Sequence, residues 1–522
     1  MDSPFGHRLN TNYTPSDEEI ETIRRDLDPH ILELERLNER ISELTAQKTQ
    51  LEGYINSHKA LISHPRRLPP DILQEIFIAC LPTTRNAVMS AQEAPLLLCR
   101  ICRQWRAVAL STPRLWSYLH LSAGFISAVD ARLSAVSQWL QRAAACPITL
   151  SLSHEDWNYY RSGLPTLFEI LADFAPRYRV LELLHLNHDN VRELADIRPT
   201  SLEVLKFTGK LSVLSQLPLV AAPKLRAVTI RSQSSERLDN DILPLPLVWA
   251  QLTHITLSSR SIGPGYDFSL RTLLQLFGRC PALQSFRLSD ASLDGAVDHP
   301  ADLITLPSLE SLVISHSLVA PSALIHFLEL VSMPQLNHFH FPVRVAQGPA
   351  TESASFFLVP LSSSSPHLST LAIWLACMSR QSLLATLESF PALTTLIIFD
   401  RCPSATDFMN LLTPPNMASD LLCPALQELE LKQCRILPKS ALDSFLDRRA
   451  GRLRRLSIDT SLQGLRGPDL MSEEEIQAHR ARGVRISFQE QVAWDDGVWG
   501  PPKQSPWTGL PSDADNVEWF SM

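Results

Sequence analysis

The residue pairs that come closest to a chemical site are Cys99-x-x-Cys102 and His338-x-His340. Zinc sites take four ligands, or three and a water, and neither pair has a second Cys or His pair at zinc spacing. Cys102 falls on a predicted helix, and alternation along a predicted strand places both histidines on its solvent face. We therefore predict that the cysteines pack inside the protein and that no metal is bound.

Motifs of the common catalytic classes are missing from the sequence. It has no Gly-x-Ser-x-Gly elbow, no phosphate-binding Gly-Lys loop, no dinucleotide-binding glycine run and no His-Glu-x-x-His pattern. We therefore predict a protein that is not an enzyme, with no catalytic residue and no cofactor. Its work would be recognition.

The composition argues against two classes of partner. The 522 residues carry a net charge of −8, and no Lys/Arg block stands out, which argues against nucleic acid and membrane surfaces. No apolar run is long enough to span a bilayer, and the start, Met1 to Pro4, is unlike a signal peptide. The nine scattered cysteines are typical of reduced thiols. We expect a cytoplasmic or nuclear protein.

A short segment from Arg67 to Trp116 carries more large apolar groups than about fifty residues can bury alone. Ile72, Ile76 and Phe77 recur at helical spacing after a tandem proline, which is a common helix start. A second predicted helix carries Leu98, Ile101, Cys102, Trp105 and Ala109 on one face, and Thr112-Pro113 begins a further turn. A partner protein is one place for this surplus; packing inside the segment or against the next domain is the other.

This segment resembles the F-box, a helical module that binds the Skp-type adaptor of cullin-RING ubiquitin ligases. The resemblance rests on Leu68-Pro69, Ile72, Ile76-Phe77, the run Cys102 to Trp105 and the run Pro113 to Trp116. The polar connection from Pro82 to Pro95 is longer than many F-boxes carry. The resemblance implies that the adaptor is bound by Leu68, Pro69, Ile72, Ile76, Phe77, Ile101, Cys102, Trp105, Leu115 and Trp116.

A heptad pattern precedes this segment. One seam position holds Ile20, Leu27, Leu34, Ile41, Lys48, Ile55 and Ile62, and the other holds Ile23, His30, Leu37, Leu44, Leu51 and His58. Because Asp28-Pro29 is a good cap and first helical position, we predict a continuous helix from about Pro29 to Ile62. The helix would form a coiled coil with a second copy or another protein, with Lys48 and His58 setting the register. The alternative is a helix that packs back along its own domain.

Behind Trp116 the chain repeats a unit of helix, proline and a strand of the form Leu-x-x-Leu-x-Leu. Examples are Leu202/Leu205/Phe207, Leu283/Phe286/Leu288 and Leu393/Leu396/Ile398, and the units lie roughly 23 to 33 residues apart. A proline precedes many of the strands, where it would stop the helix. The pattern is similar to the leucine-rich repeat, although the turn Asn of that family is mostly absent. We predict an irregular horseshoe with strands inside and uneven helices outside.

Bulky side chains gather on the predicted concave face of this sheet. Trp374 and Phe399 occupy matching positions of successive repeats, with Ile397 beside Phe399 and His340 one repeat earlier. Exposed aromatic groups at such a place are candidate hot spots for binding a substrate protein. The alternative is that a long loop or the C-terminal tail with its tryptophans covers them.

The predicted fold class is α/β: an N-terminal coiled-coil helix and an all-α F-box hairpin, followed by an irregular leucine-rich-repeat solenoid with its parallel sheet on the concave face. The predicted boundaries are 1–18 for a disordered N-terminus, 19–63 for the helix, 64–118 for the F-box, 119–490 for the solenoid and 491–522 for a flexible tail. A capping box at Ser472 to Glu475 and a last strand at Val484 to Phe488 would close the stack. The resemblances imply a substrate-recognition subunit of a ubiquitin ligase; the alternative is a ligase-independent scaffold built on the coiled coil and the repeats.

Overall fold

The computed structural model describes residues 4–62, 64–122, 129–153, 164–186, 194, 196–232, 241–259, 268–289, 293–294, 303–315, 317–318, 321–341, 343–344, 358–375, 380–399, 405–412, 422–432, 439–459 and 471–489. The predicted tail beyond residue 490 therefore lies outside the described residues. Contacts divide the chain into two units, Met1–Glu75 and Ile76–Met522. No helix of the described ranges is both long and apolar enough to cross a membrane.

The N-terminal unit is dominated by one long helix, α1 (Asp17–Leu61). Its start is held by a reciprocal pair, in which Glu19 N–H donates to Ser16 Oγ at 3.4 Å and Ser16 N–H donates to the Glu19 carboxylate at 2.9 Å. The predicted start near Pro29 is therefore wrong, because this capping pair begins the helix earlier and Pro29 lies inside it. The residues before the helix also contact it, since Arg8 pairs with Glu19 and the Tyr13 hydroxyl donates to the same carboxylate.

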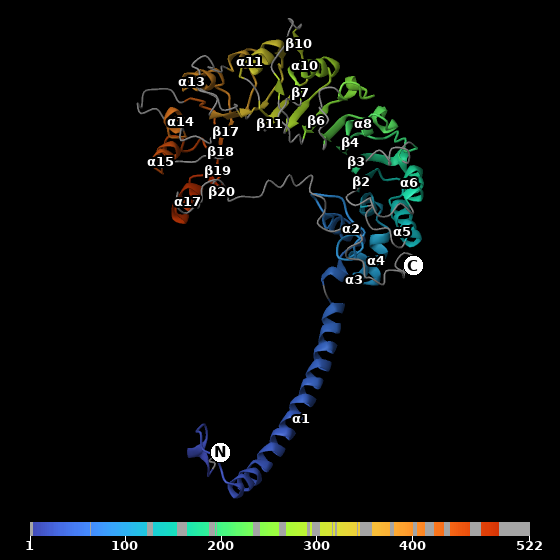
Figure 1. The fold of residues 1–522 in the computed structure, drawn as a ribbon, viewed down its shortest axis with the longest axis vertical. Helices are drawn as coiled ribbons and strands as arrows, with labels where there is room; N and C mark the ends of the chain where they lie inside the picture. The colour runs from blue at the N-terminus through green and yellow to red at the C-terminus, as the bar shows by residue number, and fades with distance from the viewer. Residues whose placement is uncertain are drawn as a thin grey trace. The chain divides into compact units, whose positions relative to one another are not determined.

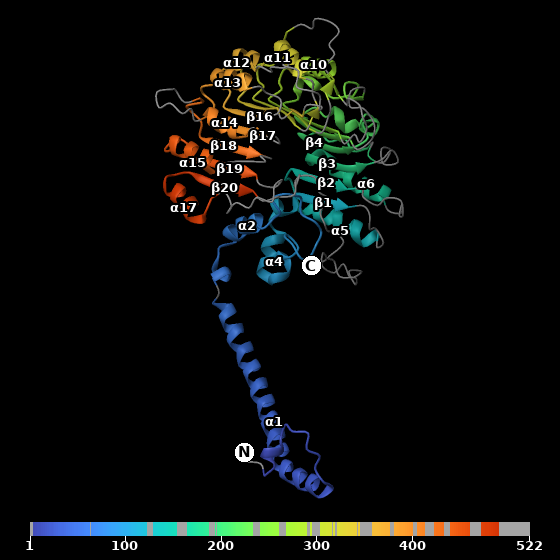
Figure 2. The same ribbon diagram turned by 60° about the vertical axis from the view of Figure 1, so that its left-hand side comes forward.

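The second unit is built on a parallel sheet of 14 strands in the described ranges, in which spatial neighbours follow chain order. Figures 1 and 2 show these strands along the inner side of the curve and helices along its outer side. The strands are β1 (Tyr118–Ser122), β2 (Ile148–Ser153), β3 (Tyr178–Leu186), β4 (Val204–Gly209), β5 (Ala227–Ser232), β6 (His254–Ser259), β8 (Ser285–Ser289), β11 (Ser311–Ser315), β14 (His338–Phe341), β16 (Thr370–Trp374), β17 (Thr395–Phe399), β18 (Glu428–Lys432), β19 (Arg455–Asp459) and β20 (Arg485–Gln489). The predicted α/β repeat solenoid is confirmed.

The outer elements differ from repeat to repeat, as the uneven spacing predicts. Helices cover most repeats, and short 3-10 turns contribute to two of them: η6 (Pro218–Ala221) follows a four-residue helix after β4, and η7 (Trp249–Gln251) precedes β6. The helices are α5 (Val129–Arg142), α6 (Leu164–Asp173), α8 (Leu211–Leu214), α10 (Leu270–Arg279), α11 (Pro321–Leu330), α12 (Val359–Ser364), α13 (Arg380–Ser389), α14 (Ala405–Leu412), α15 (Lys439–Arg448) and α17 (Glu473–Ala481). Short strand pairs, β7 (Phe268–Ser269) with β9 (Leu293–Asp294), β10 (Ile304–Thr305) with β13 (Val331–Ser332) and β12 (Ser317–Leu318) with β15 (Val343–Arg344), join neighbouring repeats.

The prolines before the strands make a tight turn. The N–H of Leu283 donates to the carbonyl of Cys280, and Leu309, Leu336, Leu393 and Leu426 donate in the same way to the residue three positions earlier. Pro281 and its counterparts thus occupy the second position of a β-turn, where the fixed φ of proline fits. The turn carries the first consensus leucine into the core, where Leu283 is fully buried.

A ladder of main-chain hydrogen bonds runs across the entrances of the strands. Arg226 N–H donates to Glu203 at 2.9 Å, Thr253 to Arg226 at 2.8 Å and Gln284 to Thr253 at 2.8 Å, and the series continues to Arg485, which donates to Arg454. Backbone atoms alone can hold this register, and the hydroxyls of Thr253, Ser369 and Thr394 add hydrogen bonds to the same carbonyls.

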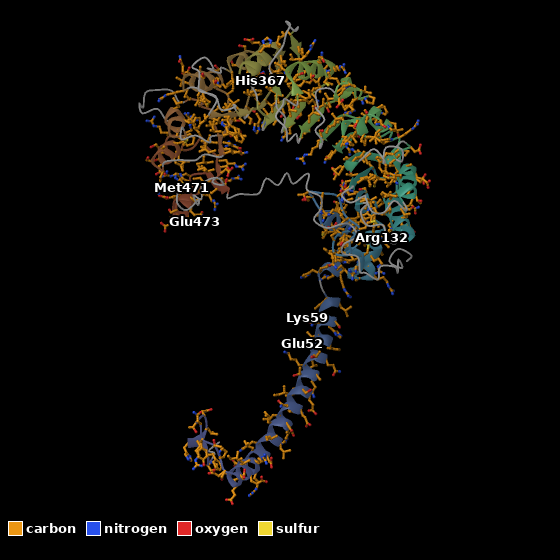
Figure 3. The ribbon with its side chains drawn as sticks, viewed as in Figure 1. Glu52, Lys59, Arg132, His367, Met471 and Glu473 are labelled. Atoms are coloured by element: carbon orange, nitrogen blue, oxygen red, sulfur yellow. The ribbon has the colours of Figure 1, made fainter. Side chains whose placement is uncertain are left out.

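The last repeat closes as the sequence predicts. Ser472 and Glu475 form a capping box at the start of α17, whose first residue, Glu473, is labelled in Figure 3. Gly483, with a φ of 88°, follows the helix and leads into β20. This positive φ favours glycine, which explains why the helix ends there.

Candidate protein-binding surface

The helical segment that precedes the sheet in the chain holds α2 (Pro70–Ala79), α3 (Leu98–Ile101), α4 (Arg103–Leu110) and η3 (Pro113–Trp116), and the division between the two units falls inside α2. The predicted single helix from Leu98 to Ala109 is interrupted, because Cys102 is extended with a φ of −160°. The Cys102 sulfur accepts a hydrogen bond from the Trp105 N–H at 3.5 Å, so this thiol acts as the N-cap of α4. Sequence periodicity does not report such a cap, since cysteine seldom serves as one.

Three of the ten predicted adaptor contacts are core residues. Phe77, Leu115 and Trp116 are fully buried in the free chain, so the prediction that they anchor a partner is wrong. The Phe77 ring lies 4.9 Å from the ring of Trp105, and the Trp116 indole meets Trp139 of α5 edge-on at 4.9 Å. Trp116 Nε1 also donates to the Ala109 carbonyl at 2.9 Å. The Phe77 ring thus packs α2 against α4, and the Trp116 ring packs η3 against α5.

The opposite side of this segment exposes apolar side chains. Ile76 is 40% exposed, Ile101 is 55% exposed, and Leu97, which the sequence prediction omitted, is 38% exposed. Ile72 lies one turn before Ile76 on α2 and is 45% exposed. Leu68, Cys102 and Trp105 are half-buried and Pro69 is exposed. The run Leu96-Leu97-Leu98 is the sequence signal for the missed residue, because three adjacent leucines cannot all face one core.

The polar connection between α2 and α3 packs on the first strands of the sheet. The side-chain amide of Asn86 donates to Ser151 Oγ at 3.0 Å, and the His120 N–H donates to the Ala87 carbonyl at 2.8 Å. Glu93 pairs with Arg85 and accepts a hydrogen bond from the Val88 N–H at 2.8 Å. These contacts attach the connection to β1 and β2. They give a physical reason for a connection that is longer than the one many F-boxes carry.

His120 lies at the centre of this attachment. The ring Nδ1 shares a hydrogen bond with Ser151 Oγ at 2.8 Å, and among the described residues Nε2 has no partner. Burial lowers the pKa of His120 to about 4, with Arg85 lowering it further and Glu93 opposing the shift. The imidazole is therefore neutral at physiological pH.

The predicted cluster on the concave face forms, but it is not exposed. Trp374 and Phe399 lie opposite each other in register and stack with ring centroids 5.9 Å apart. His340 lies 5.5 Å from Phe399, and Ile397 completes the cluster with Ala372. Trp374 is 8%, Ile397 9% and Phe399 4% exposed, so the predicted exposure is wrong. Strands about 4.8 Å apart place bulky groups of adjacent repeats against one another. The C-terminal tail that could also cover them lies outside the described residues.

The thiols and imidazoles show no arrangement for chemistry. Burial raises the pKa of Cys280 to about 12 and that of Cys423 to about 11, which keeps both protonated at neutral pH. Within the described ranges no three His, Cys, Asp or Glu side chains gather to hold a metal ion, and the cysteines there are free. The candidate binding feature of the described residues is therefore the exposed apolar surface on α2 and α3.

Comparison with known proteins adds little to this description. No family model matches the sequence, and no curated protein matches it. One solved structure that resembles it is the crystal structure of the Rad7 and Elc1 complex in yeast, with 12% identity over 87% of this chain and 96% of that chain. The TM-score is 0.36. That score is too low to support an argument, so the fold class rests on the strand pairing described above.

Proposed function

We propose that this chain is a substrate-recognition subunit of a cullin-RING, SCF-type ubiquitin ligase. In this proposal the α2 to η3 segment binds a Skp-type adaptor protein and the repeat sheet binds a target protein. The observation that carries it is the exposure of Ile76, Leu97 and Ile101 on a segment whose other side is anchored in the repeat unit. The resemblance of the same segment to the F-box supports the identity of the partner.

Catalysis would belong to the other subunits of the assembly. A receptor subunit needs no nucleophile and no proton carrier, because it only holds the target near the ubiquitin-transferring subunit. Cys280 and Cys423 are buried and protonated, so neither offers the accessible thiolate that a thiol ester carrier requires, whereas Cys80 is exposed. We accordingly propose that this chain has no catalytic residue of its own.

The test is binding of the purified full chain to the adaptor, with Ile101→Asp as the main variant. A charge at an apolar anchor should weaken binding at least about tenfold, since buried anchors at interfaces are worth roughly 2 kcal/mol or more. Val248→Asp is the matched control, because Val248 is an exposed apolar residue of the repeat unit at 45% exposure. Equal adaptor affinity of both variants, or no binding by the folded wild type, would contradict the proposal.

The double variant Leu68→Ala/Pro69→Ala tests the part of the F-box resemblance that precedes α2. We expect it to lose adaptor binding while its circular dichroism and melting temperature stay those of the wild type. Pro69 is exposed and Leu68 half-buried in the free chain, so truncation there removes little packing. Full retention of binding would show that the adaptor contacts begin at α2.

A second candidate is a ligase-independent scaffold in which the helical segment is a cap on the solenoid. The observation in its favour is the attachment of residues 82–95 to β1 and β2, through Asn86 and Ala87. A cap of this kind protects the edge of the first strand, which would otherwise be open to pairing with another chain. A folded protein that binds no Skp-type adaptor at micromolar concentration would favour this function.

Because Trp374 and Phe399 are buried, we propose that a target protein binds another part of the concave face. Exposed charged residues on the described strands are Arg179 on β3, which pairs with Glu203, Arg287 on β8, Arg455 on β19 and Arg485 on β20. Arg455 and Arg485 lie opposite each other in register. We propose that a target protein contacts such charges, which would make its association sensitive to salt. Once a target is known, Arg455→Glu/Arg485→Glu should slow association, and an unchanged rate would exclude this end of the sheet.

A further inference from the structure

The apolar seam of α1 is exposed along its length. Leu27, Leu34, Leu37, Ile41, Leu44, Leu51 and Ile55 are each between 46% and 61% exposed. Isolated apolar residues are common on protein surfaces, but a continuous stripe of this length marks an interaction surface. The stripe repeats every seven residues over four heptads, which a straight helix can keep facing one partner only in a left-handed supercoil.

We propose that α1 forms a parallel, in-register, two-stranded coiled coil with a second copy of this chain, along the seam from Leu27 to Ile55. In the carboxyl-terminal half of the seam, Ile41 and Ile55 occupy the first core position and Leu44 and Leu51 the second. The first position also holds Leu27, Leu34 and Lys48, and the second also holds His30 and Leu37. β-Branched residues at the first position and leucine at the second favour parallel dimers over larger assemblies. This inference is independent of adaptor binding.

The charges beside the seam allow the helix to pair with itself in parallel. In a parallel pair, the residue just before each first core position faces, on the second copy, the residue five places later in the sequence. For this seam the facing pairs are Asp26 with Ile31, Glu33 with Asn38, Arg40 with Thr45, Gln47 with Glu52 and Tyr54 with Lys59. None of these pairs carries like charges. Figure 3 labels Glu52 and Lys59 on α1, which both lie at these flanking positions.

An antiparallel pair is less favourable when the two seams overlap fully. Arg40 would then face Arg40 of the second copy, and Lys48 would lie opposite His30. Like charges at such positions destabilise a coiled coil. In the parallel pair Lys48 meets its own counterpart, but its long side chain can extend to water, and a lysine at a core position restricts the register.

The first turns of α1 already contact the residues that precede the helix, so the seam open to a second copy begins at Leu27. Arg8 lies over the Tyr13 ring at 4.2 Å and both contact Glu19, in the turns where Ile20 and Ile23 are half-buried. Charged residues beside the seam form ion pairs within the helix, such as Arg40 with Glu43 at 2.9 Å. Those charges stabilise the single helix and leave the apolar stripe for the second copy.

The oligomeric state of the purified full chain tests this proposal by sedimentation equilibrium or light scattering. The wild type should have twice the chain mass of 58.4 kDa, and Leu44→Asp should have the mass of one chain. Ala46→Asp is the matched control, since Ala46 lies in the same turn on the outer face and is exposed; it should stay a dimer. A monomeric wild type, a larger assembly, or equal masses for the two variants would overturn the proposal.

Cross-linking tests the orientation. In a parallel, in-register pair, Lys48→Cys places two thiols at the same layer of the core, so mild oxidation should link most chains into covalent dimers. Ala46→Cys, on the outer face, and the wild type with its native cysteines give the background. A dimeric Lys48→Cys protein that cross-links no more than the Ala46→Cys protein would overturn the parallel arrangement.

Discussion

His120 shows how a single residue can make the attachment of the helical segment dependent on pH. His120 is 3% exposed, and among the described residues the only hydrogen bond of its ring joins Nδ1 to Ser151 Oγ. Protonation would place a charge in this buried site, near Arg85. Protonation of the ring should therefore weaken the attachment of residues 82–95 to β1 and β2.

We predict that stability falls as the pH drops through this window. The pKa of His120 is about 4 in the folded protein against 6.5 for the free residue, so the unfolded chain binds the extra proton first. The contribution is complete above pH 6.5 and is lost toward pH 4; between pH 7 and pH 5 it amounts to about 2 kcal/mol. Urea unfolding at both pH values measures it.

His120→Asn is the comparison for that experiment, because an amide can replace Nδ1 without titrating. The variant should lose about 2 kcal/mol less than the wild type between the two pH values. Equal losses would show that other groups set the pH dependence.

The Trp374 and Phe399 pair illustrates what a sequence pattern does and does not report about a residue. Alternation within the strands correctly placed both on the concave face and in neighbouring repeats. It could not report exposure, because that depends on the size of the side chains on the adjacent strands. Ala372 and Ile397 fill the remaining space beside the rings.

We therefore predict that Trp374→Ala/Phe399→Ala destabilises the free protein. Loss of a large buried aromatic group costs about 3 to 5 kcal/mol, so the unfolding midpoint in urea should fall clearly. Arg287→Ala on the same face of β8 is the control and should change it little, since Arg287 is exposed. An unchanged unfolding midpoint in the double variant would contradict this prediction, and both rings would again be candidate hot spots for target binding.

At the scale of elements, helix ends were harder to predict than helices. Ser16 and Glu19 form the same reciprocal cap as Ser472 and Glu475, yet only the second was predicted. Pro29 supplied a competing signal, because proline is common in the first turn and uncommon inside a helix. Cys102 gave no signal at all, and the break between α3 and α4 followed from its cap.

The cap of α17 yields a prediction for that element alone. Ser472→Ala should cost about 1 kcal/mol of helix stability and raise hydrogen exchange in residues 473–481, while exchange in β16 and β17 stays unchanged. Hydrogen bonds from Lys439 and the Ser472 N–H lower the pKa of Glu475 to about 2. The cap should therefore persist at neutral pH and weaken only below about pH 4.5, as the carboxylate becomes protonated.

At the scale of the whole chain, the repeat unit is built on one long sheet of 14 described strands, and each strand pairs with those of the neighbouring repeats. Stability in such arrays is close to a sum of repeat and interface contributions, so position matters. Leu396→Ala, at a fully buried site of β17, should cost about 2 to 5 kcal/mol and lower the main unfolding transition.

Ile486→Ala in β20 should instead loosen only the final repeat. Ile486 is buried, and β20 is the last strand of the sheet among the described residues. Circular dichroism melting and hydrogen exchange distinguish the two variants. Identical effects on the main transition would mean that the array unfolds as one cooperative body.

The strand order of the whole unit was predictable because each strand follows its predecessor in the sheet, and the recurring leucines mark each one. The boundary of the exposed surface on α2 and α3 was not. It depends on how residues 82–95 and Trp116 pack on β1, β2 and α5, which are contacts between segments that the repeat pattern does not connect.

The ladder at the strand entrances has a consequence for engineering this chain. The ladder fixes the strands from their N-terminal side, and proline turns do so as well before strands such as β8, β11, β14, β17 and β18. In those repeats the stretch between the end of one strand and the next proline can therefore differ in length. The natural spacing already varies from roughly 23 to 33 residues. A peptide tag or a small fluorescent domain inserted there should leave the sheet intact, whereas one extra residue between a proline and its strand should dislocate it.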